Sequence, residues 1–181
     1  MSEIVINTNR LILKGISPQV IHELFATGSE DDIKAFFGID EKGYQRFKEM
    51  HEKGIVTHAY SLFFFLLIEK DTGKPIGECG FHTWNKTHRR AELYYTMRAD
   101  AHMRKGFMTE ALEQVIKYGF ENMELHRIEA LIAYSNIPSL KLMGRLGFVF
   151  EGTMREDYVV NGKSEDSDCY SLLKHEWQAA H

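Results

Sequence analysis

The chain has 181 residues, 44% hydrophobic and 27% charged, which is enough to bury the core of one domain spanning residues 1–181. Its net charge of −4 argues against broad nucleic-acid binding, which needs a basic face, and is compatible with a cationic substrate. No apolar run approaches the ~20 residues that cross a bilayer, no secretory signal is visible and two cysteines make no disulfide framework, so we expect a cytoplasmic protein without a membrane partner.

The first half of the chain predicts a strand, several helices and a hairpin. Ser17 and Pro18 mark a helix start, because a hydroxyl caps the first turn and proline suits its first position. Gly28 is a typical stop for that helix. The elements expected here are a strand at 10–13, a helix at 18–28, one or two short helices within 31–54, and paired strands at 61–69 and 76–84.

The second half predicts alternating strands and helices, followed by a second hairpin. Asn161-Gly162 is a strong short hairpin signal. The elements expected here are strands at 90–97 and 127–133, a helix whose buried face is Leu112, Val115, Ile116, Phe120 and Met123, a short helix at 137–146, and hairpin strands at 148–160 and 164–173. This order predicts an α/β fold of the α+β type, in which one central, mostly antiparallel sheet has helices on both faces.

A basic loop lies between the third expected strand and the helix that follows it. A helix N-terminus offers unpaired backbone N–H groups and partial positive charge, to which basic side chains add full charge. The loop therefore suits a pyrophosphate, although its residues also fit a basic surface turn closed by a glycine. It matches neither the Walker nor the Rossmann glycine spacing. The loop residues are Met103, Arg104, Lys105, Gly106, Phe107, Met108 and Thr109.

Motifs along nearly the whole chain occur in the order of one known family. These are Thr8–Leu13, Ile76-Gly77 with Gly80, Arg90–Leu93, Asn136-x-x-Ser139, Leu146-Gly147-Phe148, and Tyr170–Leu173 with Glu176-Trp177. On them the sequence resembles the GNAT superfamily of acyl-CoA-dependent N-acetyltransferases, and within it the RimJ/RimL-type branch. His88–Glu92 and Lys117–Phe120 are also similar to bacterial spermidine N-acetyltransferases.

This resemblance implies a GNAT domain that uses acetyl-CoA as co-substrate. The strand near 96–98 would separate from the strand at 127–133, and the pantetheine arm would lie in the gap. Backbone N–H groups near Met97 and Arg98 would then face the thioester carbonyl. Asn136 would bind the pantetheine amides, and Arg145 would reach the nucleotide phosphates, unless they are an ordinary turn residue and a solvated helix charge. Met103 and Met108 depart from the family's loop pattern, and the stretch from Glu92 to Gly106 is one residue longer than usual.

The resemblance also suggests two catalytic residues. Glu92 would accept the proton of the amine through water, unless it is a structural carboxylate paired with Arg89 or Arg90. Ser139 would lie near the leaving sulfur. It also fits a helix-start cap, and both roles can hold at once. Many family members place a tyrosine acid where this chain has Met143, which leaves more of that role to Ser139.

The second hairpin is the expected acceptor side. Glu156 and Tyr158 are two residues apart and so share a face of their strand, although a hairpin with merely polar edges explains them as well. The acceptor would be a protein N-terminal amine, as in ribosomal proteins, or a small amine such as a polyamine. A non-catalytic acetyl-CoA-binding module and a general nucleotide-binding domain are the other interpretations. We expect no metal, because no Cys/His ligand spacing occurs, and a homodimer is a further expectation.

Overall fold

The computed structural model describes residues 4–55 and 61–180. None of the helices in these ranges has the length and apolar character that a membrane crossing requires. In chain order the elements are β1 (Val5–Asn7), β2 (Leu11–Ile16), α1 (Pro18–Thr27), α2 (Glu30–Phe37), α3 (Glu41–Lys53), β3 (Ser61–Glu69), β4 (Pro75–Asn85), β5 (Arg90–Met97), the short 3₁₀ helix η1 (Asp100–His102), α4 (Phe107–Glu121), β6 (Arg127–Ala133), α5 (Ile137–Arg145), β7 (Val149–Val160), β8 (Lys163–Leu173) and α6 (Lys174–Ala180).

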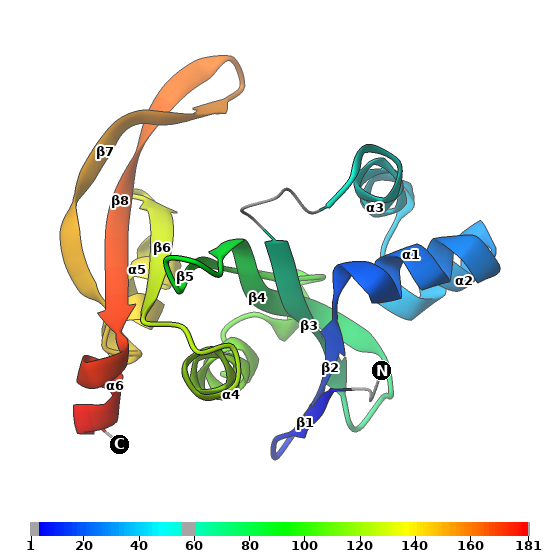
Figure 1. Cartoon of the computed structure of the whole chain (residues 1–181). Coiled ribbons are helices and arrows are strands. Elements are labelled where there is room, and N and C mark those ends of the chain that lie inside the picture. The colour runs from blue at the N-terminus through cyan, green and yellow to red at the C-terminus, as the bar shows by residue number, and fades with distance from the viewer. Residues whose placement is uncertain (1–3, 56–60, 181) are drawn as a thin grey trace.

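One eight-stranded sheet runs through the molecule in the order β1-β2-β3-β4-β5-β6-β8-β7. Every neighbouring pair is antiparallel except β5 and β6, which are parallel. The expected mixed, mostly antiparallel sheet is therefore confirmed. Figure 1 shows the β7–β8 pair rising from the rest of the sheet as a curved arm.

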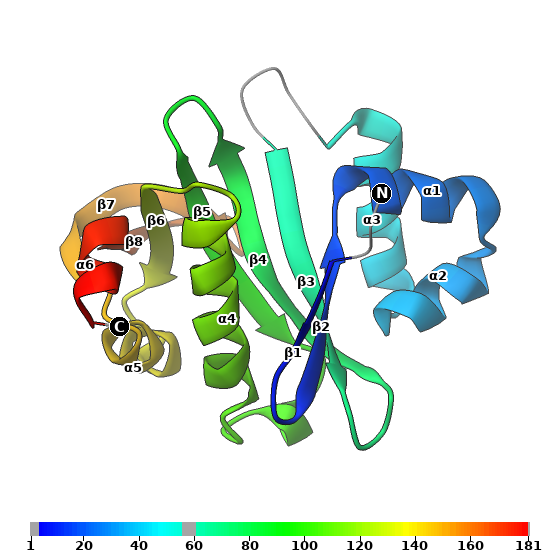
Figure 2. The same ribbon diagram turned by 60° about the horizontal axis from the view of Figure 1, so that its bottom comes forward.

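The two faces of the sheet carry two hydrophobic cores. On β3, Phe63 and Phe65 belong to the core beneath α4 and α5, whereas Phe64 and Leu66 belong to the core beneath α1, α2 and α3. This division follows from the two-residue period of a strand, which turns successive side chains to opposite faces. Figure 2 shows α4 crossing one face of the sheet while α1–α3 stand apart at the β2–β3 side. Helices on both faces are thus confirmed.

Most of the expected elements occur at or near their predicted positions. Ser17 caps α1 through a hydrogen bond from the N–H of Val20 to its hydroxyl. Three elements were not anticipated, the three-residue strand β1, the 3₁₀ helix η1 and the short helix α6. The assignment of Met123 to the buried helix face was wrong. The helix ends at Glu121, and Met123 packs against the core from the turn that follows.

Candidate functional site

A cavity opens where β5 and β6 separate. The two strands pair only from Arg90 beside Arg127 to Glu92 beside Glu129. Beyond these pairs lies a cavity of about 270 Å³, lined by His82, Glu92, Leu93, Tyr94, Tyr95, Ala130, Leu131, Ile132, Ala133, Asn136 and Ser139. Three residues selected from the sequence, Glu92, Asn136 and Ser139, thus meet at one place.

The strand edge at this gap offers backbone hydrogen-bonding groups to a ligand. The N–H of Arg98 donates to the carbonyl of Ile76 on β4 at 2.8 Å. In an antiparallel ladder, alternate residues point their N–H and C=O toward the same neighbour, so Met97 and Tyr95 point theirs to the opposite side, toward the gap. The expectation for Met97 is consistent with this register. Arg98 was misplaced, because its N–H is already bonded to β4.

Among the described residues, no arginine forms an ion pair or hydrogen bond with Glu92. Arg90 donates to Glu129 at 2.6 Å, and Arg89 donates to the carbonyl of Glu124. The hydrogen bonds of Arg89 and Arg90 thus do not support the structural alternative for Glu92, although the charge of Arg90 lowers the pKa of Glu92. The nearest polar groups are Thr83, whose hydroxyl lies 3.4 Å from Oε2, and His82, whose Nε2 lies 3.4 Å from Oε1.

This environment favours the protonated form of Glu92. Burial, and next the nearby charges of Glu129 and Asp157, raise the pKa of Glu92 from 4.5 to about 7. Burial and the charge of Arg46 lower the pKa of His82, so His82 is neutral near pH 7 and does not hold Glu92 as an ion pair. Glu92 can therefore gain or lose a proton near neutral pH.

The cavity has a different chemistry on each side of the sheet. Glu92 and Tyr94 alternate with Tyr95 along β5, so their side chains project to opposite faces. The hydroxyl groups of both tyrosines are buried and lack a hydrogen-bond partner among the described residues. Burial raises the pKa of Tyr95, and the adjacent Ser139 side chain partly offsets this increase. Sequence reasoning missed both tyrosines, because only the separation of β5 from β6 makes them cavity residues.

The capping alternative for Ser139 is wrong, because another residue caps α5. Asn136 is the residue that caps α5, because its Oδ1 accepts the N–H of Ser139 at 3.3 Å. The Ser139 hydroxyl is left to face the cavity. Arg145 lies at the other end of α5, exposed, with its Nε donating to the carbonyl of Lys141 at 3.3 Å. It lies outside the cavity lining, and its expected contact with phosphates stays a prediction.

The loop before α4 exposes main-chain donors and two basic side chains. Arg104 has φ +59° and Gly106 has φ +80°, and Gly106 is the N-cap of α4 without a side-chain cap bond. The first N–H groups of α4 therefore lack partners within the helix. The Phe107 side chain is buried in the core, which restricts any ligand role of this residue to its backbone.

Arg10 holds this loop in place. It donates from Nη1 to the carbonyl of Lys105 at 2.9 Å and from Nε to Glu110 at 2.7 Å, and it lies 4.5 Å above the Phe107 ring. Thr8 also donates to Glu110, at 2.6 Å. The sequence alone indicates no role for Thr8 and Arg10. Their contacts with α4 join residues about a hundred positions apart in the chain.

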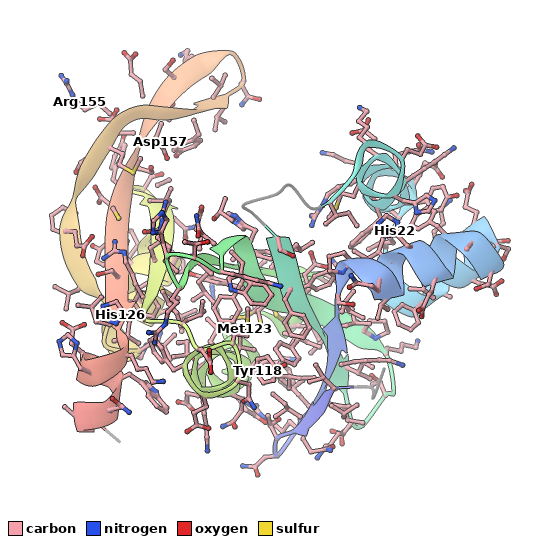
Figure 3. The ribbon with its side chains drawn as sticks, viewed as in Figure 1. His22, Tyr118, Met123, His126, Arg155 and Asp157 are labelled. Carbon is pink, nitrogen blue, oxygen red and sulfur yellow. The ribbon has the colours of Figure 1, made fainter. Side chains whose placement is uncertain are left out.

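The hairpin arm differs from its expected alternation. Between Met154 and Tyr158, β7 has a bulge, and Glu156 takes φ +52°. The two-residue spacing therefore no longer shows that Glu156 and Tyr158 share a face, and their contact with an acceptor stays a prediction. Asp157 accepts a hydrogen bond from Ser167 and influences Glu92 electrostatically, whereas Arg155 points away on the outer side of the arm (Figure 3).

The geometry fits a long ligand that has an amide arm at one end and phosphates at the other. A strand edge with unpaired N–H and C=O groups suits an extended amide arm, and a basic loop at a helix N-terminus suits phosphates. The Tyr95 hydroxyl, on the same side of the cavity as Ser139, lacks a geometric hydrogen-bond partner among the described residues and is available to such an arm. Within residues 4–55 and 61–180, no group of three or more His, Cys, Asp or Glu could hold a metal ion.

Comparisons with known proteins agree with this geometry. The Acetyltransferase (GNAT) domain family matches residues 10–149. The chain is similar to YoaA of Bacillus subtilis, named as an uncharacterized N-acetyltransferase, with 31% identity over 94% of this chain and 97% of that one. It is also similar to YdaF of the same organism, a candidate ribosomal N-acetyltransferase, with 37% identity over 59% and 57% of the two chains.

A third relative has a named small-molecule activity. It is the spermidine N(1)-acetyltransferase of Vibrio cholerae, with 30% identity over 70% of this chain and 72% of that one. A solved structure of a dodecameric spermidine N-acetyltransferase from Vibrio cholerae matches with a TM-score of 0.69 at 22% identity, covering 94% of this chain and 97% of that one. At 22% identity, the match to this solved structure shows a shared fold.

Proposed function

This chain belongs to the GNAT family of N-acetyltransferases, and we propose that its acceptor is the terminal α-amine of a protein or peptide. The family implies acetyl-CoA as co-substrate. Acetyl transfer to an amine is supported by Glu92, which lines the cavity between β5 and β6 and has a pKa of about 7. The β7 strand of the neighbouring arm is largely exposed, and we propose that it contacts the chain of a large acceptor.

Glu92 is the proposed general base. Acetyl-CoA supplies a thioester carbonyl that a neutral amine can attack. An amine is mostly protonated at neutral pH, so a group with a pKa near the working pH has to remove that proton. Glu92 meets this requirement, and its position permits transfer either directly or through one water molecule.

The strand edge is the proposed positioning element. The N–H of Met97 would donate to the ligand where negative charge develops on oxygen, which is the usual way such charge is stabilised. Holding two reactants together in this manner can be worth ~7–11 kcal/mol of barrier. The loop at 103–109 would anchor the phosphate end, with Arg104 and Lys105 supplying positive charge.

Ser139 and Tyr95 are the proposed partners of the leaving sulfur. They project from α5 and β5 into the face of the cavity opposite Glu92. The position of the usual family tyrosine holds Met143, which is fully buried in the core and cannot donate a proton. Tyr95 keeps its own proton at neutral pH, because burial raises its pKa, and can therefore hydrogen-bond the thiolate as it departs.

A peptide acceptor is favoured over a polyamine by the open side of the site. The β7–β8 arm carries acidic residues that attract cations generally, so charge alone does not separate the two. An exposed arm accommodates a chain that continues beyond its amine, and YdaF offers a relative named for a ribosomal acceptor. A polyamine remains the second candidate on the similarity to spermidine N(1)-acetyltransferase.

The direct test is release of free CoA thiol with a panel of acceptors. The panel contains peptides beginning with Ala, Ser or Met, together with spermidine and small primary amines. We expect turnover with peptides whose amine is free and none with the same peptides already N-acetylated. Turnover with spermidine at higher kcat/KM than with any peptide would contradict the proposal.

A further inference from the structure

A group of polar side chains on the α1–α3 face of the sheet has no role in the acetyl transfer described above. At its centre lies Glu78 of β4, which is fully buried. Arg98 donates to Oε2 of Glu78, and Arg46 of α3 donates to Oε1 at 3.2 Å. Two guanidinium groups thus face one carboxylate, and the group retains one net positive charge.

This group contains more donors than acceptors. The Tyr94 hydroxyl and the Nε of Arg98 are both buried without a hydrogen-bond partner among the described residues. Glu78 pairs with Thr96 in the β4–β5 ladder, so Tyr94 is its diagonal neighbour on the same face of the sheet. The charges of Glu78, Arg46 and Arg98 also act on Tyr94. A buried donor without a partner costs free energy, so an oxygen from a ligand would stabilise this face.

The group adjoins the proposed catalytic site through Tyr94, while Arg46 and Arg98 lie outside the cavity lining. Tyr94 lines the same cavity as Glu92 and follows it by two residues on the same face of β5. Two residues of a strand span about 7 Å. The Arg46 side chain is 55% exposed, so a ligand that enters from solvent can reach it.

We propose that Arg46, Tyr94 and Arg98, hereafter the donor site, bind a carboxylate of the acceptor while Glu92, about 7 Å from Tyr94 along β5, faces the reacting amine. A peptide whose second residue is Asp or Glu carries a carboxylate at that distance from its α-amine. A polyamine has only cationic groups to offer there, and two arginines would repel them. This inference rests on the proposed function and adds to it the charge of the acceptor's second residue.

The test compares two peptides that differ at the second residue alone, one beginning Ser-Glu and the other Ser-Gln. The wild-type enzyme should use the Glu peptide with about tenfold higher kcat/KM, mainly through KM, as charge-assisted hydrogen bonds are stronger than neutral ones. Arg46→Gln should remove this preference, which is read as the ratio of kcat/KM for the two peptides within the same variant. Tyr94→Phe should reduce the preference in part.

A matched control separates the donor site from general surface charge. Arg155→Gln removes an exposed arginine on the outer side of the arm, which Figure 3 shows pointing away from the site. It should keep the full preference for the Glu peptide. Equal use of the two peptides by the wild-type enzyme, or a preference that survives Arg46→Gln, would overturn the inference.

Binding distinguishes failure of this inference from failure of the proposed function. If neither peptide is acetylated, the proposed acceptor class is wrong, and calorimetric titration of the same two peptides still reads the donor site. Tighter binding of the Glu peptide to the wild type but not to Arg46→Gln supports the donor site. Equal affinities refute it.

Discussion

Glu92 illustrates a cost that the fold bears for its proposed chemistry. In the unfolded chain its proton leaves near pH 4.5, whereas burial keeps the proton bound to about pH 7 in the folded protein. Between these pH values the folded state binds a proton that the unfolded state has lost. The free energy of unfolding therefore decreases as pH rises through this range.

Glu92→Gln should remove this loss of stability. The variant should melt at a higher temperature than the wild type at pH 8, by an amount equivalent to at most about 3 kcal/mol. The difference should decline toward zero as pH falls to 4.5, because both proteins are then neutral at this position. Thermal unfolding across pH 4.5–8 measures it, and a variant that is less stable at pH 8 would contradict the assigned environment of Glu92.

Tyr95 is proposed to hydrogen-bond the thiolate of CoA as it departs. Tyr95→Phe should lower kcat by about tenfold or more, with little change in the Kd for CoA, since the ring and its packing are retained. Ser139→Ala should act in the same direction. Tyr118→Phe is a matched control, because that tyrosine packs from α4 against Phe63 and Phe65 and lies outside the cavity lining. A weakened Kd with unchanged kcat would instead assign Tyr95 to binding.

At the scale of elements, the N-terminal segment and α4 act as one unit. Arg10 and Thr8 both bond to Glu110 in the first turn of α4, and Arg10 also bonds to the loop carbonyl of Lys105. These bonds fix the direction in which the helix N-terminus and its loop face. The family-like opening segment thus has a physical role, which is to orient the proposed phosphate loop.

Arg10→Gln should therefore weaken CoA binding without unfolding the protein. We expect the Kd for CoA to rise by about tenfold, since the loop loses charge-assisted hydrogen bonds that hold it in place. Lys117→Gln, an exposed charge further along α4, should leave the Kd unchanged. An unchanged Kd in Arg10→Gln would show that the loop keeps its conformation without this contact.

Elements were easier to predict than their mutual contacts. Alternating apolar residues, capping hydroxyls and turn pairs are local signals, and they gave β3, β5 and β6 at their observed bounds. Gly80 must be glycine because β3 and β4 lie close together there, and a Cβ at this position would lie 2.3 Å from the Cα of Phe64 on β3. The bulge in β7 and the use of Arg98 by β4 depend on pairing between distant segments, which a single sequence does not display.

The same limit explains which site residues the sequence identified. Glu92, Asn136 and Ser139 carry motif positions and line the cavity. Tyr94 and Tyr95 look like ordinary strand residues until β5 separates from β6, and Arg46 acquires interest only because α3 packs above Glu78. Sequence motifs therefore located the proposed chemistry, while recognition of the acceptor required the three-dimensional arrangement.

At the scale of the whole molecule, charge is unevenly distributed. Residues 151–168 carry six acidic and two basic side chains, and they form the arm that Figure 1 shows curving above the sheet. Such an arm produces a negative potential on the proposed acceptor side. Association into a homodimer stays a prediction, which sedimentation velocity at several protein concentrations would check.

The acidic arm should make turnover sensitive to salt. For a peptide with a basic tail, kcat/KM should fall several-fold between 0.1 M and 1 M salt, because the Debye length shortens from about 10 Å to about 3 Å. A peptide with the same first two residues and an uncharged tail serves as the control and should change little. If kcat/KM falls equally with salt for the two peptides, the acidic arm does not contribute to acceptor recognition.

Glu92 is proposed to remove the proton from the attacking amine, and the pH dependence of thiol release is the decisive measurement of this role. The base acts as its carboxylate, so kcat/KM of the wild type should fall about tenfold for each unit of pH below a pKa of about 7. Glu92→Gln should lose about 10²-fold or more in rate at pH 8 and lack this break in its profile, while Glu121→Gln, an exposed control on α4, should match the wild type. A Glu92→Gln variant that keeps both the rate and the break would contradict the account.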